Sequence, residues 1–181
     1  MVLREKKKGS LAVMSGLSGS GKSTTAQQLA KQSHAIRLRS DAVRKHLAGI
    51  DLHEKGGDEI YTPEMTDKTY SRLIELGVQL AKRGDRIILD AKFDRQAKRQ
   101  EALTAANANS LPITFLHCTA PPEVLKSRVE KRSGDIADAT AAVLAKQSME
   151  PFTEADPVIV VDTTHSVEEI QSLLSRSFPA Q

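Results

Sequence analysis

The stretch that decides the fold of this 181-residue chain is Leu11-Ala-Val-Met-Ser15 together with Gly16-Leu17-Ser18-Gly19-Ser20-Gly21-Lys22-Ser23. Its first five residues form a short apolar run that predicts a buried strand. The next eight fit the pattern G-x-x-x-x-G-K-[ST], in which a glycine-rich loop leads from a strand into a helix. We therefore predict a phosphate-binding loop (P-loop) at residues 16–23.

Each part of this loop has an expected role toward a nucleotide. Glycines let the backbone curl so that its N–H groups point at phosphate oxygens, and the helix that begins near Lys22 adds its positive end. Lys22 is expected to reach the β- and γ-phosphates, Ser23 to offer a hydroxyl to Mg²⁺, and Thr24 to contact the α-phosphate. The expected ATP-binding residues here are Gly16, Leu17, Ser18, Gly19, Ser20, Gly21, Lys22, Ser23 and Thr24. Binding, hydrolysis and transfer all begin with such a loop.

Short apolar runs alternate with amphipathic stretches along the chain, which predicts an α/β fold with a mostly parallel sheet. The expected strands are residues 11–15, 35–39, 86–90, 113–118 and 158–162. Four of them are apolar enough to be buried on both faces. The second alternates polar and apolar residues, so we expect it at an edge.

Capping signals mark the starts of helices. N-cap residues are expected at Thr62, Asp94, Asp138 and Ser166. Pro63 in the first turn strengthens the first start, and Glu169 completes a capping box with Ser166. Residues 49–61 and 132–138 show no period and are predicted to be loops.

Charge and composition narrow the class of protein. Lys and Arg number 26 against 23 Asp and Glu, and much of the excess lies in residues 1–9, which we predict to be a flexible basic tail before one domain at 10–181. Aromatic residues are only 3% of the chain, which disfavours a nucleic-acid partner. The lone Cys118 excludes an intramolecular disulfide, and no apolar run approaches the roughly 20 residues of a membrane helix. We expect a cytoplasmic protein without a membrane segment.

The residues that argue for phosphoryl transfer follow the second expected strand. Ser40, Asp41 and Arg44 lie where ligands of open α/β sheets gather. Asp41 suits the base that receives the acceptor's proton, and Arg44, one turn further along a helix, suits charge neutralisation at the acceptor or the moving phosphoryl group. The alternative is that Ser40 or Asp41 only caps a helix at 42–48.

A second acid, Asp90, ends the third expected strand, the usual place for a carboxylate that orders Mg²⁺. The alternative is a simple turn residue. No glutamate follows it, which disfavours an ATPase that activates water.

Two arginines, Arg128 and Arg132, are spaced to share one face of a predicted helix at 121–132. A loop at 133–138 follows, and such a loop closing over ATP would bring positive charge to the γ-phosphate and exclude water. The alternative is an ordinary solvated helix face.

The P-loop, the Ser-Asp-x-x-Arg element and the arginine-bearing helix occur in this order in the superfamily of small P-loop kinases, which the chain resembles. That superfamily includes gluconate kinase, chloramphenicol phosphotransferase, zeta toxins and the polynucleotide kinase domain. The chain looks closest to the AAA_33-like predicted ATP-binding kinases, which also occur fused behind an aminoglycoside-phosphotransferase-like domain. Residues 60–70, 88–91, 120–125 and 134–135 carry this narrower match.

The resemblance implies a parallel sheet of order 2-3-1-4-5 with a small lid, and ATP and Mg²⁺ as ligands. It implies that Asp41 activates the acceptor, that Arg44 holds the acceptor side, and that Arg128 and Arg132 serve the lid. Thr163 would lie near the adenine. The predicted function is therefore transfer of the γ-phosphate of ATP to a hydroxyl of a small molecule. A nucleic-acid 5′-hydroxyl kinase and an ATP-binding switch with little chemistry, in which Asp41 is dispensable, remain alternatives.

Overall fold

The computed structural model describes residues 7–133 and 147–180, except for the side chains of residues 132 and 133. Most of the predicted basic tail, the predicted lid loop after Ser133 and the predicted cap at Asp138 lie outside this part. The strands are β1 Ser10–Ser15, β2 Ile36–Arg39, β3 Arg86–Asp90, β4 Ile113–Thr119 and β5 Val158–Asp162. The helices are α1 Lys22–Ser33, α2 Ser40–Ala48, the short η1 Asp58–Tyr61, α3 Pro63–Lys82, α4 Gln96–Ala108, α5 Pro122–Ser133 and α7 Val167–Leu174.

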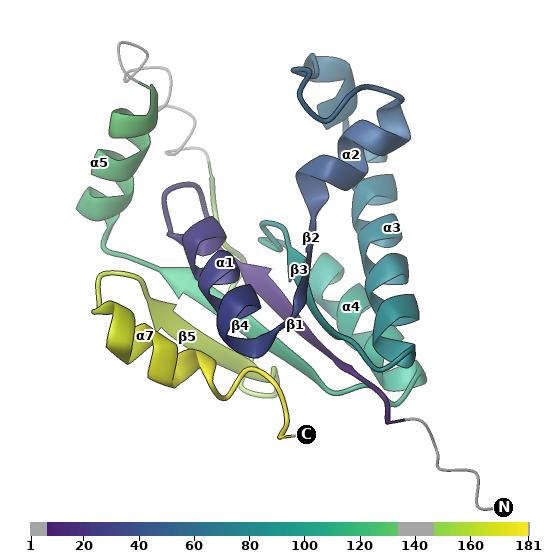
Figure 1. The fold of residues 1–181 in the computed structure, drawn as a ribbon. Coiled ribbons are helices and arrows are strands. Elements are labelled where there is room, and N and C mark those ends of the chain that lie inside the picture. Colours follow the sequence, from purple (N-terminus) through teal and green to yellow (C-terminus); the bar gives the residue numbers. More distant parts are fainter. Residues whose placement is uncertain (1–6, 134–146, 181) are drawn as a thin grey trace, which may run out of the picture.

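The five strands form one parallel sheet of order β2-β3-β1-β4-β5, which confirms the predicted topology and the edge position of β2 (Figure 1). Helices cover both faces of the sheet. Ala12 and Met14 of β1 pack in a core with residues of α1 and α7, whereas Leu11 and Val13 pack in a second core with residues of α3 and α4. This alternation follows from the two-residue period of a strand.

β5, at the edge of the sheet opposite β2, is less buried than predicted. Val161 of β5 is buried in the core beneath α1 and α7. Val160, on the opposite side of the strand, is 57% exposed. The prediction that β5 is buried on both faces is therefore wrong, because an apolar sequence does not show whether helices will cover both faces of an edge strand.

Two predicted helix starts are confirmed in detail. The Thr62 hydroxyl accepts a hydrogen bond from the Met65 N–H at the start of α3. Ser166 and Glu169 form both hydrogen bonds of the capping box at the start of α7. These signals could be read from the sequence because each involves neighbours along the chain.

The predicted cap at Asp94 is wrong. The N-cap position of α4 is Arg95, and its side chain makes no capping bond. The Glu150 carboxylate, 54 residues further along, accepts from the Gln96 N–H at 2.7 Å instead. This hydrogen bond is the main reason why the pKa of Glu150 lies below its usual value.

The pairing of β1 with β3 brings the P-loop next to the segment that follows β3. Ala12 of β1 pairs with Ile88 of β3, so the carboxyl ends of these central strands lie side by side. The Gly16 N–H donates to the carbonyl oxygen of Lys92 at 3.0 Å, which joins the P-loop to the segment after β3. The site therefore forms at the carboxyl edge of the sheet, as expected for open α/β folds.

No helix within residues 7–133 and 147–180 is long and apolar enough to cross a membrane.

Candidate active site

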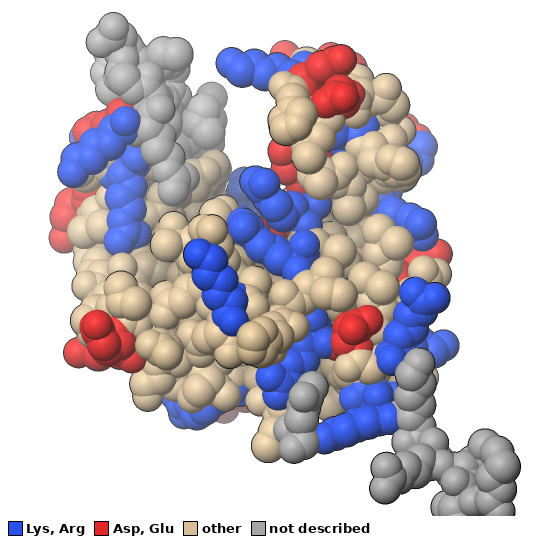
Figure 2. Space-filling model, viewed as in Figure 1, with Lys and Arg blue, Asp and Glu red and all other residues tan. Residues whose placement is uncertain are grey.

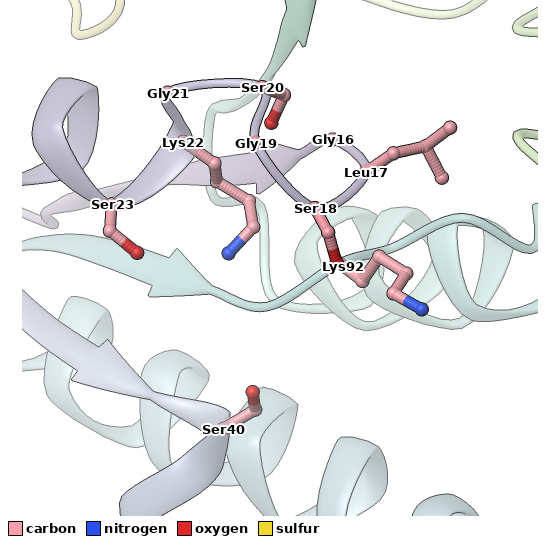
Figure 3. Close-up of a pocket in the computed structure, with 10 residues that line it drawn as sticks. All are labelled: Gly16, Leu17, Ser18, Gly19, Ser20, Gly21, Lys22, Ser23, Ser40 and Lys92. Carbon is pink, nitrogen blue, oxygen red and sulfur yellow. The ribbon is translucent and has the colours of Figure 1, made fainter. Parts of the chain in front are cut away.

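The P-loop has the curled backbone that its glycines predict. Gly19 and Gly21 have φ angles of 78° and 82°, a region that favours glycine, and α1 begins at Lys22. A Cβ on Gly21 would also come within 2.9 Å of the Thr163 side chain. The loop lines a pocket of about 270 Å³, across which the Lys22 ammonium and the Ser40 hydroxyl face each other (Figure 3).

Lys22 belongs to a partly buried cluster of charges at the edge of this pocket. Its Nζ lies 3.1 Å from Oδ1 of Asp90, whose other oxygen accepts from Nε and Nη2 of Arg37 at 2.8 and 2.5 Å. Asp90 is only 4% exposed, so burial makes these pairings necessary. Two cations around one carboxylate leave a net positive charge at the floor of the phosphate pocket.

Sequence reasoning missed Arg37. It lies two residues before Arg39 on the same side of β2, and Arg39 is the register partner of Asp90. The available signal was an arginine in the second strand together with an acid at the end of the third. It could not be interpreted without the sheet order, which places these two strands side by side.

Ser23 lines the P-loop pocket, whereas Thr24 lines an adjoining pocket of about 260 Å³ with Arg128 and Thr163. Gly21 lines both pockets. A nucleotide with its phosphates in the P-loop therefore has space beside it on the Thr163 side.

Arg128 joins the P-loop to Thr163. Its Nη1 donates to the Gly19 carbonyl at 3.0 Å and to the Thr163 hydroxyl at 2.8 Å, and Nη2 donates to the Thr163 carbonyl at 3.2 Å. The Thr163 hydroxyl in turn donates to the Ser20 carbonyl at 2.6 Å. In this structure Arg128 stabilises the outer side of the P-loop. The predicted partner Arg132 lies one turn further along α5, and its side chain is outside the described residues.

A second pocket, of about 540 Å³, adjoins the first. Its lining comes from α2, the end of η1, α3, the segment after β3 and the start of α4: Ser40, Asp41, Arg44, Tyr61, Pro63, Thr66, Asp67, Tyr70, Lys92, Asp94, Arg95 and Lys98. Ser40 and Lys92 line both pockets, so the two spaces meet there. Figure 2 shows basic side chains gathered in the hollow between α5 and α2.

Asp41 lies in this second pocket, one residue from the junction at Ser40. Its side chain is 47% exposed and pairs with Lys45 at 3.6 Å. Both Ser40 and Asp41 are inside the first turn of α2, whose N-cap position is Arg39. The alternative that either residue merely caps a helix is therefore wrong.

Arg44 is buried in the wall of the second pocket, with 8% of its surface exposed. Its Nη1 donates to the Ile60 carbonyl at 2.7 Å and to the Thr66 hydroxyl at 3.1 Å, and the guanidinium carbon lies 4.9 Å from the centre of the Tyr61 ring. All three contacts are to uncharged groups.

Tyr70 of α3 is buried and also lines the second pocket. Its hydroxyl accepts from the Phe93 N–H at 3.2 Å. Burial is the main cause that raises the pKa of Tyr70, so the phenol stays neutral. Cys118 is likewise a packed thiol, and burial raises its pKa to about 12.

A strap at residues 147–152 connects the P-loop to α4. The Gln147 side chain accepts from the Ser18 N–H at 3.1 Å and donates to the Ser18 hydroxyl at 3.0 Å. Arg99 of α4 donates to the carbonyls of Phe93, Glu150 and Pro151 at 2.9, 2.7 and 3.0 Å. Gln147 therefore contacts the P-loop, whereas the Glu150 side chain contacts Arg95 and Gln96 at the start of α4.

Replacing Arg99 with methionine should lower the free energy of unfolding by about 3 kcal/mol, because three carbonyls lose a charged donor at a side chain that is 2% exposed. Urea unfolding measures this change. Arg72→Met is the matched control, since Arg72 is partly exposed and its one ion pair within residues 7–133 and 147–180 is with Glu75 on its own helix. An Arg99→Met midpoint equal to that of the parent would mean that Arg99 does not hold the strap.

Comparison with known proteins identifies the family. Residues 11–153 match the model of the AAA_33 family, described as an AAA domain. The chain belongs to the AAA_33 family. Among curated proteins, it is 30% identical over 140 residues to uncharacterised proteins of Mycobacterium tuberculosis and Mycobacterium bovis. The match covers 75% of this chain and 28% of theirs, so this AAA_33 chain spans little more than a quarter of their length.

Solved structures share the fold of this AAA_33 protein. A putative kinase from Chloroflexus aurantiacus is 18% identical, with a TM-score of 0.71 and 94% of each chain covered. The APS kinase CysC of Mycobacterium tuberculosis is 19% identical, with a TM-score of 0.67 and coverage of 93% and 97%. A gluconokinase from Sinorhizobium meliloti is 23% identical, with a TM-score of 0.61 and coverage of 95% and 94%. The fold expected from the resemblance to small kinases is confirmed.

Proposed function

We propose that the protein transfers the γ-phosphoryl group of ATP to a hydroxyl group of a small molecule, with Mg²⁺ as cofactor. The observation that carries this proposal is the pair of adjoining pockets. One is formed by the P-loop and the other contains Asp41 and Arg44, and they meet at Ser40 and Lys92. An ATPase needs room only for water beside the γ-phosphate, whereas about 540 Å³ accommodates a small organic acceptor.

The proposed step moves one phosphoryl group and one proton. The acceptor oxygen forms a bond to Pγ while the bond from Pγ to the β,γ-bridging oxygen breaks, and the electron pair of that bond leaves with ADP. The hydroxyl proton passes to the Asp41 carboxylate and then to solvent. Lys22 exchanges its contact with Asp90 for the β- and γ-phosphates, while Arg37 keeps the buried Asp90 paired.

Residues in the first pocket and next to it fit a magnesium ion. Ser23 offers a hydroxyl, and Asp90, which touches the neighbouring Lys22, offers a carboxylate, both of them hard oxygen ligands. Within the described residues, no group of three or more His, Cys, Asp or Glu side chains is placed to hold a metal ion. Phosphate oxygens and water would therefore complete the coordination shell of the magnesium ion. When bound, the ion would neutralise charge on the phosphate oxygens.

The nucleoside end of ATP is assigned to the pocket beside Gly21. Thr24, Arg128 and Thr163 line it, and Arg128 presents a planar cation to that space. Arg132 is kept in the proposed lid role because it lies one turn beyond Arg128 on α5.

An ATP-binding switch is the second candidate, and the Gln147 contact favours it. The amide of Gln147 occupies the Ser18 N–H of the P-loop. A nucleotide that displaced this amide would move a strap that also contacts α4 through Arg99. The switch requires no acceptor, so product formation separates the two functions.

A mass-spectrometric screen tests the proposal. Protein, ATP and Mg²⁺ are incubated with metabolite pools and with a 5′-hydroxyl oligonucleotide. A small-molecule product heavier by about 80 Da, one phosphoryl group in place of a proton, is expected only when protein and Mg²⁺ are both present. Tight ATP binding without any modified acceptor would contradict the kinase and favour the switch.

A further inference from the structure

The charges that line the second pocket do not balance. Among its lining residues are the carboxylates Asp41, Asp67 and Asp94 and the cations Arg44, Lys92, Arg95 and Lys98. Each carboxylate already has a cation beside it. Asp41 pairs with Lys45 at 3.6 Å, Asp67 with Lys98 at 2.7 Å and Asp94 with Arg95 at 3.7 Å.

Arg44 and Lys92 are the two lining cations left over. Neither has a carboxylate within ion-pair distance in residues 7–133 and 147–180. Arg95 and Lys98, by contrast, each have a second acidic partner, Glu150 and Glu101. The excess positive charge of the pocket is therefore concentrated on Arg44 and Lys92.

Arg44 is the more informative of the two because it is 92% buried, that is, 8% exposed. A buried charge is unfavourable unless it is paired, and neutral acceptors compensate it only in part. Nη1 is engaged by Ile60 and Thr66, whereas Nε and Nη2 have no hydrogen-bond partner among the described residues. A guanidinium held rigidly by one nitrogen, with its other donors available, is suited to bind an oxyanion through two parallel hydrogen bonds.

Lys92 supplies the second cation at the point where the two pockets meet. Its backbone is fixed by the hydrogen bond from the Gly16 N–H to its carbonyl. Its ammonium lies on a flexible stem and makes no hydrogen bond within the described chain, so it can reach toward the acceptor or the phosphate side. The first turn of α2, which carries Ser40 and Asp41 and has no side-chain cap, adds a favourable field for negative charge.

We propose that the phosphate acceptor is a small organic acid, a hydroxylated molecule whose own carboxylate or phosphate group binds Arg44 and Lys92 in the second pocket. This inference rests on the proposed kinase function and names its substrate class. The anionic group would anchor the acceptor against α2, so that its hydroxyl points past Asp41 to the junction with the P-loop pocket.

Matched pairs of acceptors test the substrate class. With ATP and Mg²⁺, ADP release is compared for gluconate and sorbitol, glycerol 3-phosphate and glycerol, and ribose 5-phosphate and ribose. We expect turnover with at least one acid and none with its neutral partner. Equal turnover of both members of a pair, or phosphorylation of a 5′-hydroxyl oligonucleotide in place of the acids, would overturn the inference while leaving the kinase intact.

Variants then test the two cations. Arg44→Gln should raise the KM for the acidic acceptor about 100-fold and leave the KM for ATP unchanged, because one charge-assisted contact to the acceptor is lost. Lys92→Met, which removes no contact within the described residues, should raise the same KM about tenfold. Arg72→Gln is the matched control on α3, outside both pockets, and should change neither constant. Unchanged acceptor KM values in both pocket variants would overturn the assignment.

A binding measurement keeps the inference testable even if no acceptor on this panel is turned over. Sulfate is titrated into protein saturated with Mg²⁺ and AMPPNP, whose phosphates fill the P-loop. Binding that is lost in Arg44→Gln but kept in Arg72→Gln supports the anion site, and absence of sulfate binding to the loaded protein contradicts it. Failure of AMPPNP itself to bind would instead contradict the proposed function.

Discussion

Replacing Lys22 with methionine should reduce phosphoryl transfer by about 10³-fold. The ammonium of Lys22 faces the pocket formed by the P-loop, where it would stabilise charge on the β- and γ-phosphates during transfer. Methionine preserves the unbranched apolar stem and removes only the charge and its hydrogen bonds. The measurement is the steady-state rate of ADP formation with the acceptor identified by the screen.

The fold should survive this substitution. Asp90 loses the Lys22 contact at 3.1 Å but keeps both hydrogen bonds from Arg37, so no unpaired charge is left in the core. Circular dichroism should therefore match that of the parent. Lys31→Met is the control, because Lys31 is exposed at the far end of the same helix, and it should keep the parental rate. A Lys22→Met enzyme with the parental rate would show that the P-loop lysine does not act on the transferred group.

Changing Asp41 to asparagine should lower kcat by about 10³-fold, the scale of losing a general base. The KM for ATP should change little, since Asp41 lines the second pocket and not the one formed by the P-loop. Asparagine has nearly the same size and keeps an oxygen, but it cannot take the proton of the acceptor hydroxyl. Steady-state kinetics with ATP and acceptor varied in turn separates these effects.

Asp58→Asn is the matched control for this variant. Asp58 is exposed in η1 and lines neither pocket, so its loss of charge should leave kcat unchanged. If Asp41→Asn retains the parental kcat, the base assignment is wrong. If the Asp41→Asn variant also binds ATP fully and no acceptor is modified by either protein, the ATP-binding switch would be favoured.

Much of the architecture could be predicted from the sequence because its signals are local. The P-loop is a continuous stretch whose glycines allow the required backbone and whose flanking residues make the strand and the helix. The caps at Thr62 and Ser166 likewise involve residues three positions apart. Alternating apolar runs placed all five strands, and the resemblance to small kinases supplied their order.

Only the tertiary structure decided which charges meet. Arg37 pairs with Asp90 because β2 lies beside β3, and Glu150 replaces Asp94 at the start of α4 because the strap passes that helix end. Lys92 lies where the two pockets meet because its backbone holds Gly16. The sequence by itself determined the phosphate-binding loop and the strands that present it, since these depend on neighbours along the chain. The charge of the acceptor pocket depends instead on which ion pairs form between distant segments, and that is set by packing in three dimensions.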